Sequence, residues 1–311
     1  MKLATFVCGG LERLGALTER GLLDLAAAAQ ICGQQEAAQR VLGDAMALLG
    51  SGGAGLDLAR GLLARAETLP EVVLCDPGQV TFLPPVPRPA KLLLMGGNWS
   101  EHIQDKTVQS PPVFMKPPAT TLIGHGQPIM IQKTSKCVDP EVELAVIMGR
   151  RGRYIPAERA REYVAGYTIL NDVSERAFNP RPGQERTGRD EFFDWLHGKW
   201  FDGFAPCGPY LVCTQEIADP QALDIRLRVN GETQQDSHTS HMAYTVPEII
   251  EFISQIVTLE PGDIIATGCP GSPPGGVGKA RGQYLRPGDV VEAEIEKIGM
   301  LRSPVIAEPA R

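Results

Sequence analysis

The sequence predicts an α+β fold that is mainly β, with a small N-terminal α/β domain followed by a larger domain of sandwich or barrel type. Three observations support this prediction. An Ala- and Leu-rich stretch lies near the N-terminus, prolines cluster near residue 85, and the rest of the chain is rich in short β-like runs separated by Gly and Pro. We therefore expect two domains, residues 1–85 and 86–311.

The N-terminal domain is predicted to contain strands and then helices. Between Ala26 and Ala66 apolar residues recur at helical spacing, and the segment from Gly50 to Gly55 divides this stretch into two helices. The proline-rich residues 80–91 disfavour helix and central strand, and we interpret them as a linker. Three apolar runs separated by turn residues are typical of strands: residues 2–8, 14–17 and 22–25.

The larger domain is predicted from strands that end at turn residues. Residues 225–229 alternate apolar with basic side chains and end at Asn230-Gly231, which is typical of a β-hairpin. Residues 290–298 alternate again, and one helix is expected at about Pro247 to Ile256.

The composition excludes several classes of partner. A net charge of −7 argues against nucleic acid or an anionic membrane, since both need a basic surface. No apolar run has the length of a membrane span, and the N-terminus does not resemble a secretory signal. Seven scattered cysteines favour reduced thiols in a cytoplasmic protein. We interpret Cys137, Cys207 and Cys269 as small buried hydrophobes.

The segment from Asp139 to Gly149 carries the strongest chemical pattern. Its aliphatic and β-branched residues predict a strand, on which Glu141 and Glu143 point to the same face. Two such carboxylates repel each other and lose hydration unless a cation lies between them. Mg²⁺, Mn²⁺ and Ca²⁺ prefer oxygen ligands of this kind. The alternative is an edge strand whose acids face water.

A histidine and an acid follow an apolar strand at residues 91–95. Ser100 is a suitable N-cap for a short helix, which would place His102 and Asp105 on one side of a turn. A carboxylate beside an imidazole raises its basicity, as a general base near neutral pH requires. The alternative is a surface His–Asp pair.

Further charged residues follow the acidic strand. A predicted strand at residues 166–170 leads to Asp172 and Arg176. Asp172 is a candidate metal ligand, and Arg176 is a candidate partner for a substrate carboxylate. The alternative is that Asn171-Asp172 simply forms a turn, of which Asn-Asp is equally typical. Lys199 lies among aromatic residues, which predicts a cation–π contact or a shifted pKa. The polar stretch 180–195 is predicted to be a mobile lid, with a disordered surface loop as the alternative.

Other motifs are excluded. A P-loop ending at Gly278-Lys279 needs Gly in place of Pro273 and Ser or Thr in place of Ala280. The chain has no Gly-x-Ser-x-Gly motif for a serine nucleophile. His238 and His241 have no third ligand at a zinc-like spacing.

Together these segments resemble the fumarylacetoacetate hydrolase family. The resemblance covers roughly residues 90 to 305, in order and at family-like spacing. The matching blocks are Asn98–His102, Val113–Pro117, Asp139–Ala145, Gly166–Arg176, Gly198–Pro206, Val229–Glu232, Leu259–Asp263 and Thr267–Pro270.

The resemblance implies a mixed β-roll catalytic domain, a homodimer, and a bound divalent metal ion, with Mg²⁺ first and Mn²⁺ or Ca²⁺ as alternatives. Three carboxylates are implied as metal ligands: Glu141, Glu143 and Asp172. The implied catalytic residues are the dyad of His102 and Asp105, together with Lys199. The implied substrate contacts are Arg176, Asn179, Lys116 and Thr267.

This sequence departs from the family pattern at the implied substrate end. The dyad acid is Asp105 rather than Glu, and Asn179 stands where many relatives have Gln. The usual Thr-Gly-Thr-Pro is Thr-Gly-Cys-Pro, with Pro273-Pro274 soon after it. Because the metal end keeps its pattern, the chemistry is better predicted than the substrate.

The resemblance favours a metal-dependent hydrolase that cleaves a C–C bond in a 2,4-diketo acid such as an acylpyruvate or fumarylpyruvate. His102, oriented by Asp105, would activate water, and the bond would break toward a metal-stabilised enolate with help from Lys199. One alternative is a decarboxylase, isomerase or hydratase of a 2-keto (di)carboxylate on the same site. A second is a catalytically quiet, dimeric metal-binding module.

Overall fold

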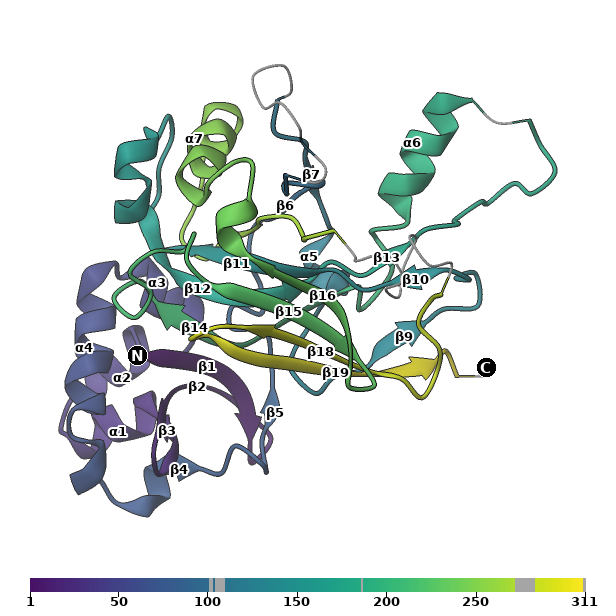
Figure 1. Ribbon diagram of the computed structural model, residues 1–311. Helices are drawn as coiled ribbons and strands as arrows, with labels where there is room; N and C mark the ends of the chain where they lie inside the picture. Colours follow the sequence, from purple (N-terminus) through teal and green to yellow (C-terminus); the bar gives the residue numbers. More distant parts are fainter. Residues whose placement is uncertain (101–102, 104–109, 186, 272–282, 310–311) are drawn as a thin grey trace.

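The computed structural model describes residues 1–311 except 101–102, 104–109, 186, 272–282 and 310–311. Sheets dominate this part of the chain, and the N-terminal helices cover one side of it (Figure 1). The predicted class, α+β and mainly β, is confirmed. The described strands form sheets that pack on each other rather than a closed barrel.

One large sheet runs through the molecule. Its strands follow the order β4-β3-β2-β1-β14-β12-β11-β17-β6-β7, with β5 beside β1 and β8 beside β14. Their bounds are β1 Lys2–Cys8, β2 Leu11–Thr18, β3 Gly21–Asp24, β4 Leu74–Cys75, β5 Thr81–Phe82, β6 Leu92–Met95, β7 Val113–Met115, β8 Leu122–Ile123, β11 Val142–Met148, β12 Val164–Asn171, β14 Ala205–Cys213 and β17 Ile264–Ala266.

A second sheet, in the order β16-β15-β18-β19-β9, packs on one face of the large sheet. The turn between β15 and β16 is the predicted hairpin, since Asn230 and Gly231 have the positive φ values, 52° and 81°, of a tight two-residue turn. A separate two-stranded ladder joins β10 to β13. The bounds are β9 Ile129–Ile131, β10 Val138–Asp139, β13 Ser174–Glu175, β15 Asp224–Val229, β16 Glu232–His238, β18 Val290–Ile295 and β19 Gly299–Ala307.

The N-terminal helical stretch contains four helices, so the prediction of two was wrong. Gly33, with a φ of 76°, follows the end of α1, and Asp44 caps α3 by accepting a hydrogen bond from the Ala47 N–H at 2.8 Å. These signals for ending and starting a helix override the continuous helical spacing of the apolar residues. The α-helices are α1 Leu25–Ile31, α2 Gln35–Arg40, α3 Ala45–Gly50, α4 Gly53–Leu63, α5 Pro118–Thr121, α6 Gly188–His197 and α7 Val246–Ile256. The 3₁₀ helices are Ala66–Thr68, Glu71–Val73, Ala157–Tyr163 and Thr239–His241.

The helix α7 agrees with the helix expected at about residues 247–256. Across the described ranges, no helix has both the length and the apolar character needed to cross a lipid bilayer.

The N-terminal residues share the large sheet with the rest of the chain. Strand β1 pairs with β14, with Lys2 opposite Val212. The Thr5 hydroxyl donates to the carbonyl of Pro85 at 2.9 Å. The division into two domains at residue 85 stays a prediction.

Strand β11 lies between β12 and β17 and is buried on both faces. Leu144 and Val146 join an apolar cluster with the second sheet, whereas Ala145 and Ile147 join a cluster with the N-terminal helices. A strand covered on both faces needs a nearly continuous apolar run, which explains the sequence of β11. Glu143 is the one charged residue in this strand, and its burial calls for a physical reason.

Candidate active site

Four segments meet at one edge of the large sheet. Because β12 and β11 are antiparallel, the end of β12 lies beside the start of β11, and the N–H of Asp172 donates to the carbonyl of Glu141 at 2.8 Å. Strand β17 is antiparallel to β11 on its other side, so the N–H of Gly268 reaches Glu143 Oε2 at 2.8 Å. Strand β6 runs parallel to β17 and ends at the same edge.

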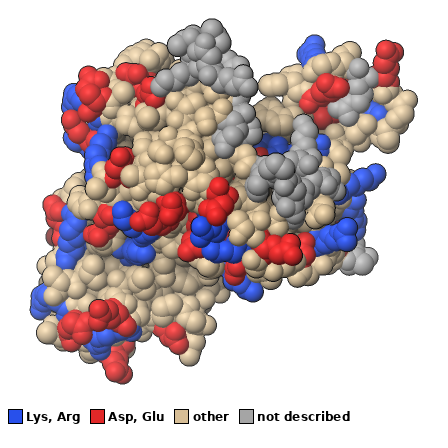
Figure 2. Space-filling model, viewed as in Figure 1, with Lys and Arg blue, Asp and Glu red and all other residues tan. Residues whose placement is uncertain are grey.

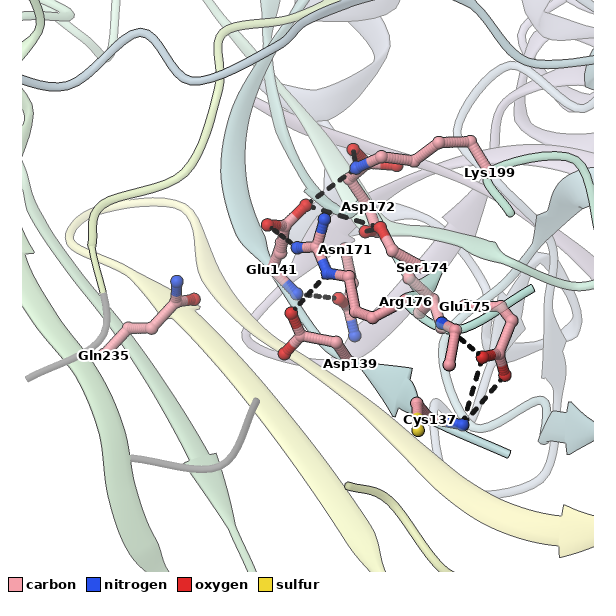
Figure 3. A network of polar contacts seen from close by, with 12 residues as sticks. Cys137, Asp139, Glu141, Asn171, Asp172, Ser174, Glu175, Arg176, Lys199 and Gln235 are labelled. Carbon is pink, nitrogen blue, oxygen red and sulfur yellow. Dashed lines mark hydrogen bonds and ion pairs between the residues drawn. The ribbon is translucent and has the colours of Figure 1, made fainter. Parts of the chain in front are cut away.

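Glu141 is held between two cations (Figure 3). Its Oε2 accepts a hydrogen bond from Lys199 Nζ at 2.8 Å, and its Oε1 pairs with the guanidinium of Arg176. Arg176 also donates through Nε to Asp139 at 2.7 Å. Burial opposes the charge of Glu141, but Arg176 and Lys199 outweigh it and hold the pKa of Glu141 well below its usual range. Glu141 is therefore ionised.

The negative charge of Glu143 is less well compensated by neighbouring cations than that of Glu141. Its side chain is 1% exposed, and it forms no ion pair within the part of the chain that the structure describes. Burial, and then the negative charges of Asp172 and Glu141, raise the pKa of Glu143 well above its usual value. Positive charge placed beside Glu143 would therefore favour its ionised form.

Asp172 is neutralised by two lysines. Its Oδ1 pairs with Lys116 Nζ at 2.5 Å, and its Oδ2 pairs with Lys199. Lys116 is fully buried and also donates to the carbonyls of Val173 at 2.8 Å and Phe204 at 2.5 Å. Burial lowers the pKa of Lys116 to about 8. Through these contacts, Lys116 holds the carboxylate of Asp172 in position.

Lys199 joins Glu141 and Asp172 and lies against two aromatic rings. Its Nζ is 5.2 Å from the centroid of Phe114 and 5.9 Å from that of Trp195, so the predicted cation–π contact is confirmed. Burial opposes its charge, but Asp172 and Glu141 outweigh it and raise the pKa of Lys199 above its ordinary value. Lys199 is therefore a protonated donor at neutral pH.

These groups face a cavity of about 530 Å³. The predicted site residues that line it are Glu141, Glu143, Arg176 and Lys199. Gln235 and Cys269 also line the cavity, and the sequence did not indicate either as a site residue. Cys269 is buried, as expected, but its place beside the carboxylates follows from the pairing of β17 with β11, which local sequence does not reveal.

Two further predicted residues, Thr267 and Asn179, are not among those that line the cavity. The hydroxyl of Thr267 is buried and donates to the carbonyl of Leu144 at 2.9 Å. Asn179 is exposed and lines a separate cavity with His197. His102 and Asp105 lie outside the described residues.

The predicted lid, residues 180–195, includes most of helix α6. Thr187 and Asp190 form a capping box that starts this helix. Figure 1 shows α6 projecting from the body of the molecule, and Trp195 in its last turn lines the cavity. Closure of this segment over the cavity stays a prediction.

The donor groups at the cavity suit a divalent cation. One ligand atom each from Glu141, Glu143 and Cys269 lie within 4.8 Å of one another. The two carboxylates fit Mg²⁺, Mn²⁺ or Ca²⁺, and a cation between them would favour the ionised form of Glu143. Asp172 is not in this group, and both its oxygens pair with lysines. Its role as a third metal ligand stays a prediction.

Comparisons with known proteins agree with the motifs. The family model described as fumarylacetoacetate (FAA) hydrolase C-terminal matches residues 92–306. The mitochondrial oxaloacetate tautomerase of Rattus norvegicus is 40% identical over 247 residues, which cover 78% of this chain and 75% of that protein.

Two solved structures extend the likeness to nearly the whole chain. The fumarylacetoacetate hydrolase of Exiguobacterium antarcticum has a TM-score of 0.76 and 28% identity, over 99% of this chain and 100% of that chain. The maleylpyruvate hydrolase of Sphingobium, in complex with manganese(II) ion and pyruvate, has a TM-score of 0.75 and 25% identity over the same shares.

We predict that Lys116→Met destabilises the protein by about 3–5 kcal/mol, because it leaves Asp172 buried with one of its two cations removed. The free energy of unfolding from urea denaturation measures this loss. Lys133→Met is the control, since Lys133 is exposed beside Glu308 and such pairs contribute about 1 kcal/mol or less. Equal losses in the two variants would contradict the structural role of Lys116.

We predict that Glu143→Gln weakens Mn²⁺ binding by at least about tenfold to a hundredfold, since even outer-shell partners of a metal contribute that much. Isothermal titration calorimetry with Mn²⁺ and with Mg²⁺ measures the affinity. Glu292→Gln, on the partly exposed face of β18, is the control and should bind both ions as the wild type does. Unchanged Mn²⁺ affinity in Glu143→Gln would exclude Glu143 as a metal ligand.

Proposed function

The chain belongs to the fumarylacetoacetate hydrolase family, and we propose that it catalyses the metal-dependent keto–enol tautomerisation of oxaloacetate or a similar 2-keto dicarboxylate. The observation that carries this proposal is the Lys199 ammonium, which lies at the cavity beside the Glu141–Glu143 pair. A fixed positive charge there lies where an enolate oxygen would develop negative charge. The likeness to an oxaloacetate tautomerase favours this substrate.

In the proposed reaction a proton leaves the enol hydroxyl and another is added to the adjacent carbon, so no further reactant is consumed. Glu141 and Glu143 would hold the divalent cation, which supplies Lewis-acid polarisation of the 2-keto oxygen when bound. Lys199 donates a hydrogen bond to the oxygen that carries the enolate charge, and its raised pKa keeps it protonated.

Arg176 would bind a carboxylate of the substrate. It lines the cavity and is held in place by Asp139 and Glu141, so its guanidinium needs little reorganisation when an anion enters. The dyad of His102 and Asp105 is the proposed carrier of the proton, on the ground of the motif alone.

The second candidate is hydrolysis of a C–C bond in a 2,4-diketo acid, which the sequence motifs favoured. It is supported by the likeness of 99% of this chain to two hydrolases. Hydrolysis uses the same enolate stabilisation by Lys199, because the enolate is then the leaving group. It differs in needing an attacking water, for which His102 with Asp105 would be the general base.

We predict that the protein with Mg²⁺ or Mn²⁺ speeds the decay of the ultraviolet absorbance of enol-oxaloacetate, and that Lys199→Met lowers kcat by about 10²–10³-fold. Lys133→Met changes an exposed lysine that is not among the cavity-lining residues, and it should leave kcat unchanged.

The same preparations are incubated with acylpyruvates, and free carboxylic acid is measured. Stoichiometric release of that acid, with no effect on enol-oxaloacetate, would replace the first candidate with the second. Turnover of neither substrate class with either metal would contradict both.

A further inference from the structure

The Cys269 thiol is unusually placed for a buried cysteine. The residue is 7% exposed, lines the cavity, and has no hydrogen-bond partner for its thiol among the described residues. Its Sγ belongs to the group of ligand atoms, with carboxylate oxygens of Glu141 and Glu143, that lie within 4.8 Å of one another. The sulfur is therefore aimed at the space that the carboxylates share.

The backbone around Cys269 is fixed on both sides. The N–H of Gly268 donates to Glu143 Oε2 at 2.8 Å, and the carbonyl of Pro270 accepts a hydrogen bond from Gln235 Nε2 at 2.7 Å. Gln235 is itself held, because its Oε1 accepts from the N–H of Val142 at 3.0 Å. A side chain on such a restrained segment loses little conformational entropy when it binds a ligand.

A thiolate changes which ions a carboxylate site prefers. Mg²⁺ and Mn²⁺ suit oxygen ligands, whereas Zn²⁺ and Cd²⁺ form strong bonds to cysteine sulfur and also accept carboxylates. A set of two carboxylates and one thiol therefore serves either kind of ion, with the sulfur discriminating between them.

We propose that Cys269 is a metal-selectivity residue that lets a thiophilic divalent cation bind through sulfur at the Glu141–Glu143 pair and compete there with an oxygen-preferring cation. This inference rests on the proposed function only in placing the divalent ion at those carboxylates. When the sulfur–metal bond forms, the S–H bond breaks and the proton goes to bulk water, with no change of oxidation state.

The test is titration of the full-length protein, kept reduced, with Cd²⁺ as the probe. We expect a cadmium–thiolate charge-transfer absorption that is lost in Cys269→Ser, with Cd²⁺ affinity lowered at least about tenfold while Mn²⁺ affinity is unchanged. Cys137→Ser is the matched control, since Cys137 is a half-buried thiol outside the Glu141–Glu143–Cys269 group, and it should keep the absorption.

Competition in the wild type gives a second measurement that needs no variant. Saturation with Mn²⁺ should suppress the absorption, because both ions use Glu141 and Glu143. An absorption of equal strength in Cys269→Ser, or one that Mn²⁺ leaves untouched, would overturn the inference. If Mn²⁺ binds normally while the sulfur contributes nothing, only this inference fails; if Mn²⁺ does not bind at all, the metal site of the proposed function fails with it.

Discussion

The need to compensate the charge of three carboxylates, two of them buried and Glu141 partly buried, is the constraint on which the rest of the site depends. Glu141, Glu143 and Asp172 lie at the edge of a sheet that is apolar on both faces, where an unpaired charge is costly. The chain supplies Lys116, Lys199 and Arg176 to oppose them. These cations account for the charge of Glu141 and Asp172, and they leave Glu143 as the group that a bound cation would stabilise.

The lysines divide into two physical roles. Lys116 pairs with Asp172 and donates its other hydrogen bonds to two backbone carbonyls, so it orders the segment that follows β12. Lys199 faces the cavity, and its ammonium is available to a ligand as well as to the carboxylates. Lys116 is therefore a positioning residue, whereas Lys199 is the lysine at the cavity. The proposed stabilisation of an enolate would need both, because the donor must be in place before charge develops.

The candidate substrate contacts are harder to predict from the sequence than the candidate metal ligands. The carboxylates lie on or next to β11 and β12, whose pairing is fixed by long apolar runs. Asn179, by contrast, lies in an exposed segment and lines a different cavity. Residues on such connecting segments are positioned by contacts that the neighbouring sequence does not specify.

The sequence by itself determined the family, the mainly β class, the hairpin at Asn230-Gly231 and the shared face of Glu141 and Glu143, because these depend on residues that are close along the chain. The tertiary structure decided which charges meet. Lys116 reaches Asp172 across 56 positions of sequence, and Cys269 joins Glu141 and Glu143 only because β17 pairs with β11. It also decided the number of N-terminal helices, since Gly33 and Asp44 interrupt a spacing that is otherwise continuous. Contacts of this kind are set by strand order and register, and the local periodicity of the sequence does not specify either.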